Sequence, residues 1–356
     1  MNLLEKLKKN STIEDTDILS KSEIFNIKDQ IPTAVPMINV ALSGDLDGGL
    51  SSGLTLWCGP SKHFKSAFSL LMAKAYMDKY PESILLFYDS EFGTPRAYFE
   101  SFEIDMTRVL HTPITDIEKL KFDIMKQLDG ITRKDKVIIV IDSVGNLASK
   151  KEVDDAMNQN QAADMTRAKQ LKSLFRMITP HLTLKDIPMI VVNHIYMTQE
   201  MYSKPVVSGG TGIYLSSDNI FIIGRQQEKD GKDVVGYHFI INVEKSRHTK
   251  EKSKIPVSVM HDGGISKWSG LLEVALEGKF VVKPNIGWYQ KIDPETGEIL
   301  EQKYREKATN TRDFWEPLLA SENFKKYIRN KFQVSHGAIM ESEIEVDELE
   351  NIGDDD

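Results

Sequence analysis

Eight consecutive residues of this chain have the types and spacing needed to bind a phosphate group. They are Gly59, Pro60, Ser61, Lys62, His63, Phe64, Lys65 and Ser66. A short apolar strand precedes them, and a segment with helical apolar spacing follows. In such a unit, backbone N–H groups and a helix N-terminus face the anion, the lysine neutralises it, and the serine hydroxyl ligates Mg²⁺. The run therefore predicts a nucleotide-phosphate site.

One position departs from the pattern Gly-x-x-x-x-Gly-Lys-[Ser/Thr], because Phe64 stands where the second glycine is expected. A side chain there can crowd the phosphates, or change the angle at which the backbone approaches them. The alternative interpretation is an ordinary strand–turn–helix that carries a Lys-Ser pair by chance.

Two acidic residues at predicted strand ends favour the nucleotide site. Asp142 follows the apolar strand 137–141, where a carboxylate can hold the water shell of Mg²⁺. Glu91 follows the strand 83–88 and can polarise a water for in-line attack on a γ-phosphate. Tyr98 can offer its ring face to adenine, although a tyrosine on an amphipathic turn is more often a packing residue. Together these residues predict ATP or GTP binding.

His194 follows another apolar strand and precedes a long polar segment, 195–212, that contains Lys204, Gly209 and Gly210. Consecutive glycine N–H groups suit a nucleic-acid phosphate, and His194 can report the nucleotide state to this loop. The alternative is a neutral histidine that satisfies backbone groups. Residues 150–164, rich in Asn, Gln and Asp, form a second candidate loop.

The most basic run of the chain, 242–254, includes Lys245 and Arg247. It can be a solvated strand and turn. It can also supply the fixed cation that phosphoryl transfer needs against developing charge, and a neighbouring subunit can provide that cation. The residues alone leave both interpretations open.

Buried strands that alternate with helices predict a mostly parallel α/β sheet covered on both faces. We expect strands at 83–88, 108–111, 137–141, 189–192 and 219–224, helices at 117–129 and about 162–180, and turns through 31–53. Ligands of such sheets bind beyond the carboxyl ends of the strands. Gly59, Glu91, Asp142 and His194 all lie at such ends, so we expect them to meet at one edge.

The two ends of the chain differ from this core. Beyond residue 236 we expect antiparallel strands at 237–244 and 255–260, a helix near 270–276, a hairpin over 287–304 and two helices with apolar faces around 314–318 and 324–332. These elements predict a small C-terminal α/β lobe. Near the other end, Leu3, Leu4 and Leu7 share one face of a short helix, which can pack on its own core or on a neighbouring copy.

The net charge of −8 over 356 residues belongs to the C-terminal end. Residues 341–356 carry nine acidic side chains and no Lys or Arg, and subtracting −9 from −8 leaves about +1 for residues 1–340. We expect a disordered acidic tail that either aids solubility or competes with nucleic acid for a basic face. The single cysteine, Cys58, suits a reducing compartment and a buried, inert thiol. No signal peptide or membrane span is visible, so we expect a soluble intracellular protein without a membrane partner.

Several blocks of the sequence resemble one family. "GPSKHFKS", "FYDSEFG", "VIIVIDSVGNLASKKE", "DMTRAKQLKSLFRMITP", "VVNHIYMTQEM" and "NVEKSR" are similar to phage UvsX-type recombinases, which are relatives of bacterial RecA. The resemblance covers about residues 30–340. UvsX-type proteins share Phe64 in place of RecA's glycine, so this departure supports the resemblance.

The resemblance implies a DNA-dependent ATPase in the host cell cytoplasm. Such an enzyme polymerises on single-stranded DNA, pairs it with homologous duplex and works with a mediator and a phage single-strand-binding protein. It implies the following roles: Lys65 and Ser66 on phosphate and Mg²⁺, Asp142 on the metal's water, Glu91 activating water, Tyr98 on adenine, His194 as a sensor where RecA has glutamine, Lys245 and Arg247 on an adjacent subunit's ATP, and Arg167, Lys169, Lys204, Gly209 and Gly210 on DNA.

We expect four regions: an N-terminal polymerisation arm (1–30), a RecA-like ATPase core (31–268), a small lobe (269–340) and the acidic tail (341–356). Two other functions remain open. A ring helicase on the same core usually has a sizeable domain before the phosphate loop, whereas 58 residues precede Gly59 here. A DNA-coating scaffold without hydrolysis would have no need of both Glu91 and Asp142.

Overall fold

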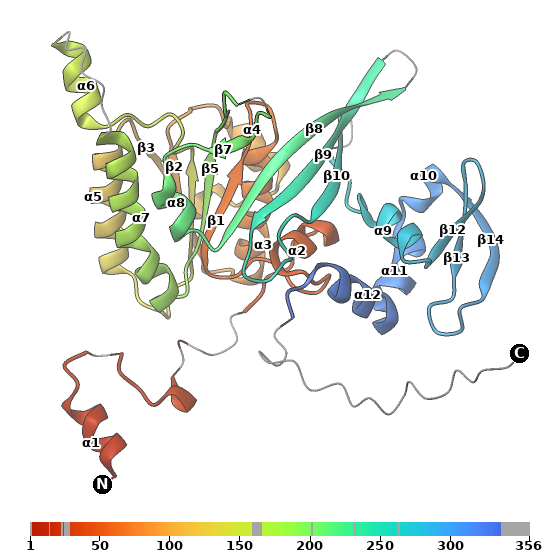
Figure 1. The fold of residues 1–356 in the computed structure, drawn as a ribbon, viewed down its shortest axis with the longest axis horizontal. Helices are drawn as coiled ribbons and strands as arrows, with labels where there is room; N and C mark the ends of the chain where they lie inside the picture. The colour runs from red at the N-terminus through yellow and green to blue at the C-terminus, as the bar shows by residue number, and fades with distance from the viewer. Residues whose placement is uncertain are drawn as a thin grey trace, which may run out of the picture.

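The computed structural model describes residues 2–13, 15–22, 24, 29–158, 166–200, 202–230, 233–261 and 264–335. Within these residues a nine-stranded sheet has the order β11-β10-β9-β8-β1-β5-β4-β2-β3 (Figure 1). Its strands are β1 (Gly53–Cys58), β2 (Ile84–Asp89), β3 (Val109–Pro113), β4 (Val137–Asp142), β5 (Pro188–Asn193), β8 (Asn219–Asp230), β9 (Asp233–Lys245), β10 (Lys254–Met260) and β11 (Gly264–Ile265). Neighbours from β3 to β8 run parallel, and β9 to β11 continue antiparallel. The predicted mostly parallel sheet is confirmed.

Helices cover both faces of the sheet, so the core has two layers. The helices of this part are α2 (Pro36–Ser43), α3 (Lys65–Lys79), α4 (Arg96–Ser101), α5 (Ile117–Gly130), α6 (Lys150–Met157), α7 (Thr166–Leu184) and α8 (Thr211–Ser216), with a 3₁₀ turn at Met106–Arg108. The apolar side chains of α2 and α3 pack on one face with Trp57 and Phe221. Those of α5 and α7 pack on the other face with Leu54 and Leu56 (Figure 1). Alternate residues of β1 therefore point into opposite layers, as the two-residue period of a strand requires.

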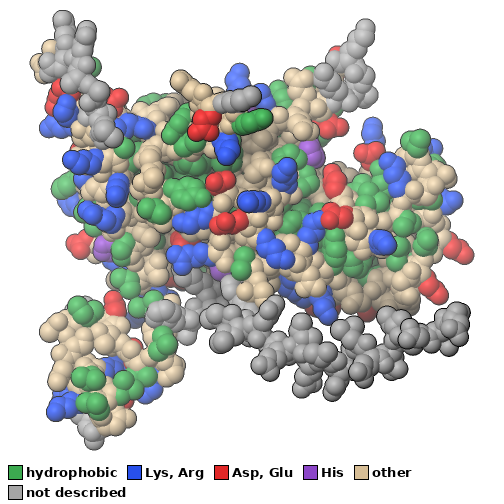
Figure 2. Space-filling model, viewed as in Figure 1, with side chains coloured by type: hydrophobic (Ala, Val, Ile, Leu, Met, Phe, Trp, Pro, Cys, Tyr) green, Lys and Arg blue, Asp and Glu red, His purple; other side chains and the backbone are tan. Residues whose placement is uncertain are grey.

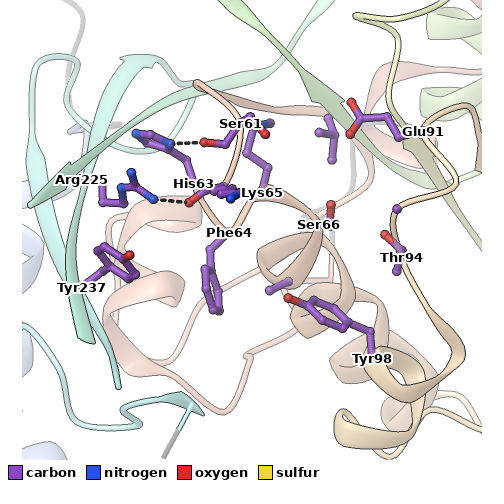
Figure 3. Close-up of a pocket in the computed structure, with 14 residues that line it drawn as sticks. Ser61, His63, Phe64, Lys65, Ser66, Glu91, Thr94, Tyr98, Arg225 and Tyr237 are labelled. Atoms are coloured by element: carbon purple, nitrogen blue, oxygen red, sulfur yellow. Dashed lines mark hydrogen bonds between the residues drawn. The ribbon is translucent and has the colours of Figure 1, made fainter. Parts of the chain in front are cut away.

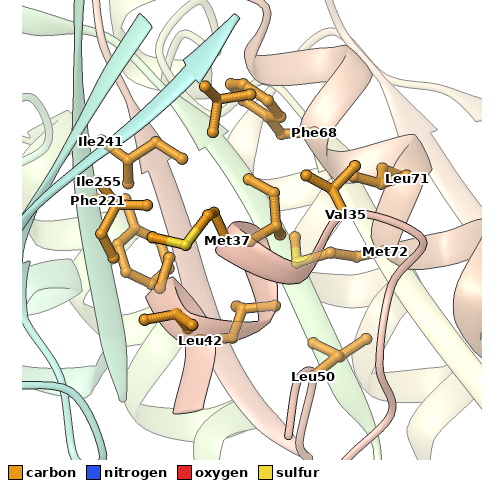
Figure 4. Close-up of a cluster of buried hydrophobic side chains, with 14 of the residues drawn as sticks. Val35, Met37, Leu42, Leu50, Phe68, Leu71, Met72, Phe221, Ile241 and Ile255 are labelled. Carbon is orange, nitrogen blue, oxygen red and sulfur yellow. The ribbon is translucent and has the colours of Figure 1, made fainter. Parts of the chain in front are cut away.

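Helix α2 lies in the stretch 31–53, which we expected to be rich in turns, and the sequence did not reveal this helix. Pro36 occupies the first turn of the helix, and Gly44 ends it in the left-handed conformation at φ 74°. The seven residues between them are all buried. Figure 4 shows α2 wedged between α3 and strands β8 to β10. A helix that is buried on every side has no polar face, so its sequence lacks the alternation that normally reveals a helix.

The two candidate loops also contain regular structure. Residues 150–157 form α6, which begins with a capping box between Ser149 and Glu152. The polar segment after His194 contains a short hairpin, β6 (Ile195–Met197) and β7 (Pro205–Val207). Residues 159–165 of the first loop lie outside the described residues. Strand β8 extends six residues beyond its predicted end because its outer half pairs with β9.

The C-terminal part forms the predicted lobe. It consists of α9 (Leu271–Glu277), β12 (Val281–Asn285), β13 (Trp288–Ile292), β14 (Ile299–Arg305), α10 (Glu306–Thr309), α11 (Arg312–Ala320) and α12 (Glu322–Phe332). Strand β12 was not expected, and it completes a three-stranded sheet with the predicted hairpin. The lobe shares its buried residues, such as Phe324, with the α2–α3 layer. The predicted acidic tail, 341–356, lies outside the described residues.

The N-terminal helix α1 (Leu3–Asn10) has no buried residue. Leu3, Leu4 and Leu7 are 72%, 52% and 58% exposed. They form the predicted apolar face, and the segment stands apart from the sheet (Figures 1 and 2). A short 3₁₀ turn, Leu19–Lys21, follows. No helix among the described residues combines the length and the apolar character needed to cross a bilayer.

Candidate functional site

The predicted phosphate loop joins β1 to α3, and both elements are fixed in the core. All of β1 is buried, and Phe68 of α3 packs against Trp57. Lys65, the first residue of α3, is 7% exposed, and its Nζ donates to the carbonyl oxygen of Pro60 at 2.8 Å. Burial lowers the pKa of Lys65, and the charges of Glu91 and Asp142 oppose this shift. The lysine ammonium thus lies inside the loop, facing two carboxylates.

Phe64 keeps the backbone conformation that a glycine would adopt. Its φ of 57° and ψ of 17° lie in the left-handed region, immediately before α3. Its ring packs against Phe239 of β9, with 5.3 Å between ring centroids, and points away from Lys65 and Ser66 (Figure 3). Left-handed backbone costs a residue with a Cβ about 1–2 kcal/mol, which the aromatic contact offsets. The side chain therefore leaves the inside of the loop open.

Asp142 ends β4 and is 2% exposed. Its Oδ2 accepts a hydrogen bond from Thr94 Oγ1 at 3.0 Å, whereas its Oδ1 has no partner among the described residues. Burial raises the pKa of this carboxyl, and an interaction with the Ser66 hydroxyl opposes the shift. A buried oxygen without a partner is costly, so this atom suits a cation or its water. Mg²⁺ takes one or two protein ligands and keeps its waters, which fits Ser66 and Asp142. No group of three or more His, Cys, Asp and Glu side chains in the described part could hold a metal.

Glu91 and His194 meet across the carboxyl ends of β2 and β5. His194 Nε2 lies 2.9 Å from Glu91 Oε1, and the buried Ser143 hydroxyl donates to the same oxygen at 2.5 Å. These two hydrogen bonds, His194 first, lower the pKa of Glu91 to about 2 despite its partial burial. Gly145 lies against the imidazole, since a Cβ there would sit 2.2 Å from His194 Cδ2. The prediction that Gly59, Glu91, Asp142 and His194 share one edge is confirmed by this arrangement.

One cavity of about 300 Å³ lies against the phosphate loop, and it is lined by Glu91 but not by Gly59, Asp142 or His194 (Figure 3). It is lined by Ser61, Lys62, His63, Phe64, Lys65, Ser66, Ala67, Glu91, Gly93, Thr94, Tyr98, Val192, Arg225 and Tyr237. Tyr98 of α4 is 38% exposed and lies on the side of Ser66. Cys58 is buried beneath the loop, and burial raises the pKa of its thiol far above the ordinary range. The prediction of a buried thiol is confirmed.

The sequence did not reveal four residues of this site. Thr94 and Ser143 hold the two carboxylates, and Arg225 and Tyr237 form the opposite wall of the cavity. Arg225 lies 4.6 Å from the centre of the Tyr237 ring, and its Nη1 donates to the carbonyl oxygen of Lys62 at 3.1 Å. Thr94 and Ser143 could have been found from the sequence, because hydroxyl residues follow closely after the strand-end acids. Arg225 and Tyr237 could not, because their contact depends on the register between β8 and β9.

Lys245 and Arg247 do not line this cavity. Strand β9 runs antiparallel to β8, so its end lies toward the amino end of β1, away from the phosphate loop. Lys245 Nζ donates to the carbonyl oxygens of Tyr214 and Leu215 at 3.0 and 3.3 Å. Arg247 Nε pairs with Asp218 Oδ1 at 2.5 Å. Neither cation meets the phosphate loop of its own chain.

A second cavity, of about 470 Å³, lies between α7 and α8 and is called the α7–α8 groove below. It is lined by Thr166, Ala168, Lys169, Lys172, Gly209, Gly210, Thr211 and Gly212. Three predicted DNA contacts, Lys169, Gly209 and Gly210, come together here with Lys172, which the sequence did not reveal. Lys and Arg side chains gather over the region of α7 in Figure 2. The groove therefore combines cations with exposed backbone.

The other two predicted DNA contacts lie elsewhere. Arg167 donates to the carbonyl oxygens of Leu147, Val144 and Gly145 at 2.8–2.9 Å, and burial lowers its pKa. Its guanidinium is therefore occupied in holding the turn that follows β4. Lys204 is exposed immediately before β7 and lies outside the groove.

Comparison with known proteins assigns this geometry to a family. The family model of the RecA N-terminal domain matches residues 5–266. The chain belongs to the RecA family. A second family model, the C-terminal domain of the recombination and repair protein of bacteriophage T4, matches residues 268–328.

Curated members of the family show how far the similarity extends. The recombination and repair protein of Enterobacteria phage T4 is 52% identical over 98% of this chain and 91% of its own length. RecA of Streptomyces ambofaciens is 26% identical over 85% and 78%, and RecA of Bacteroides thetaiotaomicron is 27% identical over 75% and 79%. The protein is thus a phage RecA-like recombinase with the DNA-dependent ATPase activity of this family. It binds a nucleotide and single-stranded DNA, and it assembles with copies of itself.

Proposed function

We propose that the protein is an ATP-dependent homologous recombinase that forms helical filaments on single-stranded DNA and catalyses homologous pairing and strand exchange. One observation supports the proposal best. Lys65 and Glu91 line one cavity, and Asp142 is near enough for its charge to act on Lys65, while Lys245 and Arg247 lie at the opposite end of β1. The site of one chain therefore has Lys62, Lys65 and Arg225 in its lining but lacks Lys245 and Arg247, the two cations that a neighbouring subunit could add against the charge that develops during phosphoryl transfer.

The residues of one chain would bind and position ATP. The loop from Gly59 to Ser66 would hold the phosphates, and Tyr98 would pack on adenine. Ser66 and Asp142 would hold Mg²⁺, which supplies charge neutralisation at the phosphates when bound. Glu91 would accept the proton of the attacking water. Because hydrogen bonds from His194 and Ser143 keep Glu91 ionised, proton acceptance requires this pair to rearrange, which makes His194 a sensor of the bound nucleotide.

A second copy would complete the site. Lys245 and Arg247 of one copy would reach the phosphates held by its neighbour, against the negative charge that develops during transfer. The exposed leucines of α1 would pack on an adjacent copy, because none of them is buried against the part of the chain that the structure describes. Such a head-to-tail interface repeats without closing and builds a filament.

Single-stranded DNA would lie along the α7–α8 groove, where Lys169 and Lys172 neutralise phosphates and the backbone of Gly209 and Gly210 approaches closely. We propose four regions: the arm (1–30), the ATPase core (31–268), the lobe (269–340) and the acidic tail (341–356). Homologous duplex, a recombination mediator and a phage single-strand-binding protein would be the other partners, in the host cytoplasm. Arg167 is left out of the DNA contacts because backbone carbonyls occupy it.

Subunit mixing tests the shared site. Glu91→Gln removes the proton acceptor from one chain, and Lys245→Ala with Arg247→Ala removes the cations offered to a neighbour. Each variant alone should lose DNA-stimulated phosphate release by about 10²–10⁴-fold, the usual contribution of such groups. An equal mixture should recover activity, because about a quarter of head-to-tail interfaces then combine intact groups from two chains.

Two outcomes would contradict the proposal. Full activity of the Lys245/Arg247 double variant would show that these cations take no part in the reaction. A mixture no more active than its components would show that the site is not shared between two copies. The matched control is Lys250→Ala with Lys252→Ala, two cations of the same basic run. Unwinding of a forked duplex without a homologous partner would favour the ring helicase, and DNA binding without any phosphate release would favour the scaffold.

A further inference from the structure

Helix α8 connects the α7–α8 groove to the two cations proposed for the neighbouring site. Its N-terminal residues line the groove. Two carbonyls in its C-terminal half, of Tyr214 and Leu215, accept the hydrogen bonds from Lys245 at 3.0 and 3.3 Å. Asp218, two residues beyond the helix, pairs with Arg247. A six-residue helix thus separates the groove from the groups that hold both cations.

The groove end of α8 is packed too tightly to move alone. A Cβ on Gly212 would lie 2.5 Å from Lys172 Cβ, and one on Gly209 would lie 2.9 Å from Leu171 Cδ1. Ile213 is fully buried in the α5–α7 layer. A strand of DNA that separates or tilts α7 and α8 therefore displaces Tyr214 and Leu215, which follow Gly212 within one helical turn.

Asp218 is held at the sheet while Arg247 is free to leave. The Asp218 carboxylate accepts the Leu54 N–H at 2.8 Å through Oδ2, and its side chain is 16% exposed. The Arg247 side chain is 72% exposed. Because the Arg247 side of this ion pair is exposed to water, the pair contributes little free energy, so a competing anion is sufficient to release Arg247.

We propose that α8 and Asp218 form a latch that keeps Lys245 and Arg247 on their own subunit until single-stranded DNA enters the groove. In the latched state the cations bind Asp218 and the α8 carbonyls. In the released state they reach the phosphates of the adjacent subunit. The inference rests on the shared site proposed above and explains how DNA stimulates hydrolysis there. Asp218 is a positioning residue, since it acts only through Arg247.

Asp218→Asn tests the latch in the full-length protein. The amide oxygen can still accept the Leu54 N–H, but the charge that holds Arg247 is gone. Phosphate release without DNA should rise about threefold to fivefold, the range that an exposed ion pair can shift. It should rise more steeply with protein concentration than in the wild type, because two copies must meet. The KM for ATP and the rate at saturating oligo(dT) should stay unchanged.

Glu316→Gln is the matched control, because it breaks an exposed ion pair with Arg312 in the C-terminal lobe. It should leave the DNA-free rate unchanged. An Asp218→Asn rate without DNA that equals or falls below the wild-type rate would overturn the latch. If this variant does not fold, Asp218→Ser offers another acceptor to Leu54 and is judged by the same result. Failure of the shared site is separate, because it appears as full activity of the Lys245/Arg247 double variant.

Discussion

Replacing Phe64 should reverse the usual order of stability between alanine and glycine variants. Glycine at an ordinary position is less stable than alanine by about 0.5–1 kcal/mol. At φ 57°, however, the left-handed backbone destabilises an alanine by about 1–2 kcal/mol and a glycine hardly at all. The difference predicts that Phe64→Gly is more stable than Phe64→Ala by about 0.5–1 kcal/mol.

Both variants should be less stable than the wild type. Full burial of a phenylalanine contributes about 3–5 kcal/mol relative to alanine. Phe64 is only half-buried, against Phe239, so we expect a loss of about 2 kcal/mol in Phe64→Ala and about 1 kcal/mol in Phe64→Gly. Because the ring points away from the inside of the loop, the KM for ATP should change less than the free energy of unfolding.

Urea unfolding, followed by the shift in midpoint at constant slope, measures these differences. Lys279 provides the control, because it is exposed, lies outside the nucleotide cavity and also has a positive φ, of 59°. Lys279→Gly should exceed Lys279→Ala in stability by the same margin, without the loss from packing. If Phe64→Ala equals or exceeds Phe64→Gly while the Lys279 pair behaves as expected, the left-handed backbone at Phe64 is refuted.

Two further predictions concern the carboxylate and the groove. Ser143→Ala removes a hydrogen bond that helps to hold the pKa of Glu91 near 2, so it should cost about 1 kcal/mol after allowance for the partial exposure of Glu91. A carboxyl whose pKa is lower in the folded state than in the unfolded state stabilises the fold at pH values above its unfolded pKa. The cost of Ser143→Ala should therefore be constant above about pH 5 and shrink as the pH falls toward 2. If urea unfolding shows the same cost at every pH, this reasoning is contradicted. On oligo(dT), Lys169→Gln with Lys172→Gln should reduce the slope of log affinity against log salt by about 0.7 for each lysine. The control Lys126→Gln on α5 should leave the slope unchanged. Equal slopes in the wild type, the double variant and the control would show that DNA does not bind in the α7–α8 groove.

Local patterns were sufficient to predict the phosphate loop and the strand-end acids. Val137–Asp142 is a continuous apolar strand followed by a turn, and its carboxylate lies where a parallel sheet binds ligands. The same rule predicted that Glu91 and His194 would meet at one edge, which they do at 2.9 Å. The alternation of strands and helices also predicted a mostly parallel sheet, and the hairpin and helices that follow predicted the small lobe, because these patterns depend on residues close together in the chain.

Helix α2 and the fate of individual cations could not be predicted in this way. A helix buried on all sides has no periodic polar face. The sequence position of an arginine does not reveal whether its guanidinium will bind backbone carbonyls or lie in solvent. Arg167 was predicted to contact DNA, and the fold turns it onto the carbonyls of the turn after β4.

The sequence by itself determined which groups can bind a phosphate, hold a metal and accept a proton, since these capacities belong to residue types and to spacing along one element. Only the tertiary structure decided which of them face one another. The pairing of β9 with β8 carries Lys245 and Arg247 away from the loop of their own chain and brings Arg225 and Tyr237 to it. The β8–β9 hairpin is local, but its position beside the phosphate loop is set by the parallel pairing of β8 with β1. Paired residues of these two strands, such as Thr55 and Asn219, lie 164 positions apart, and no local pattern encodes that pairing.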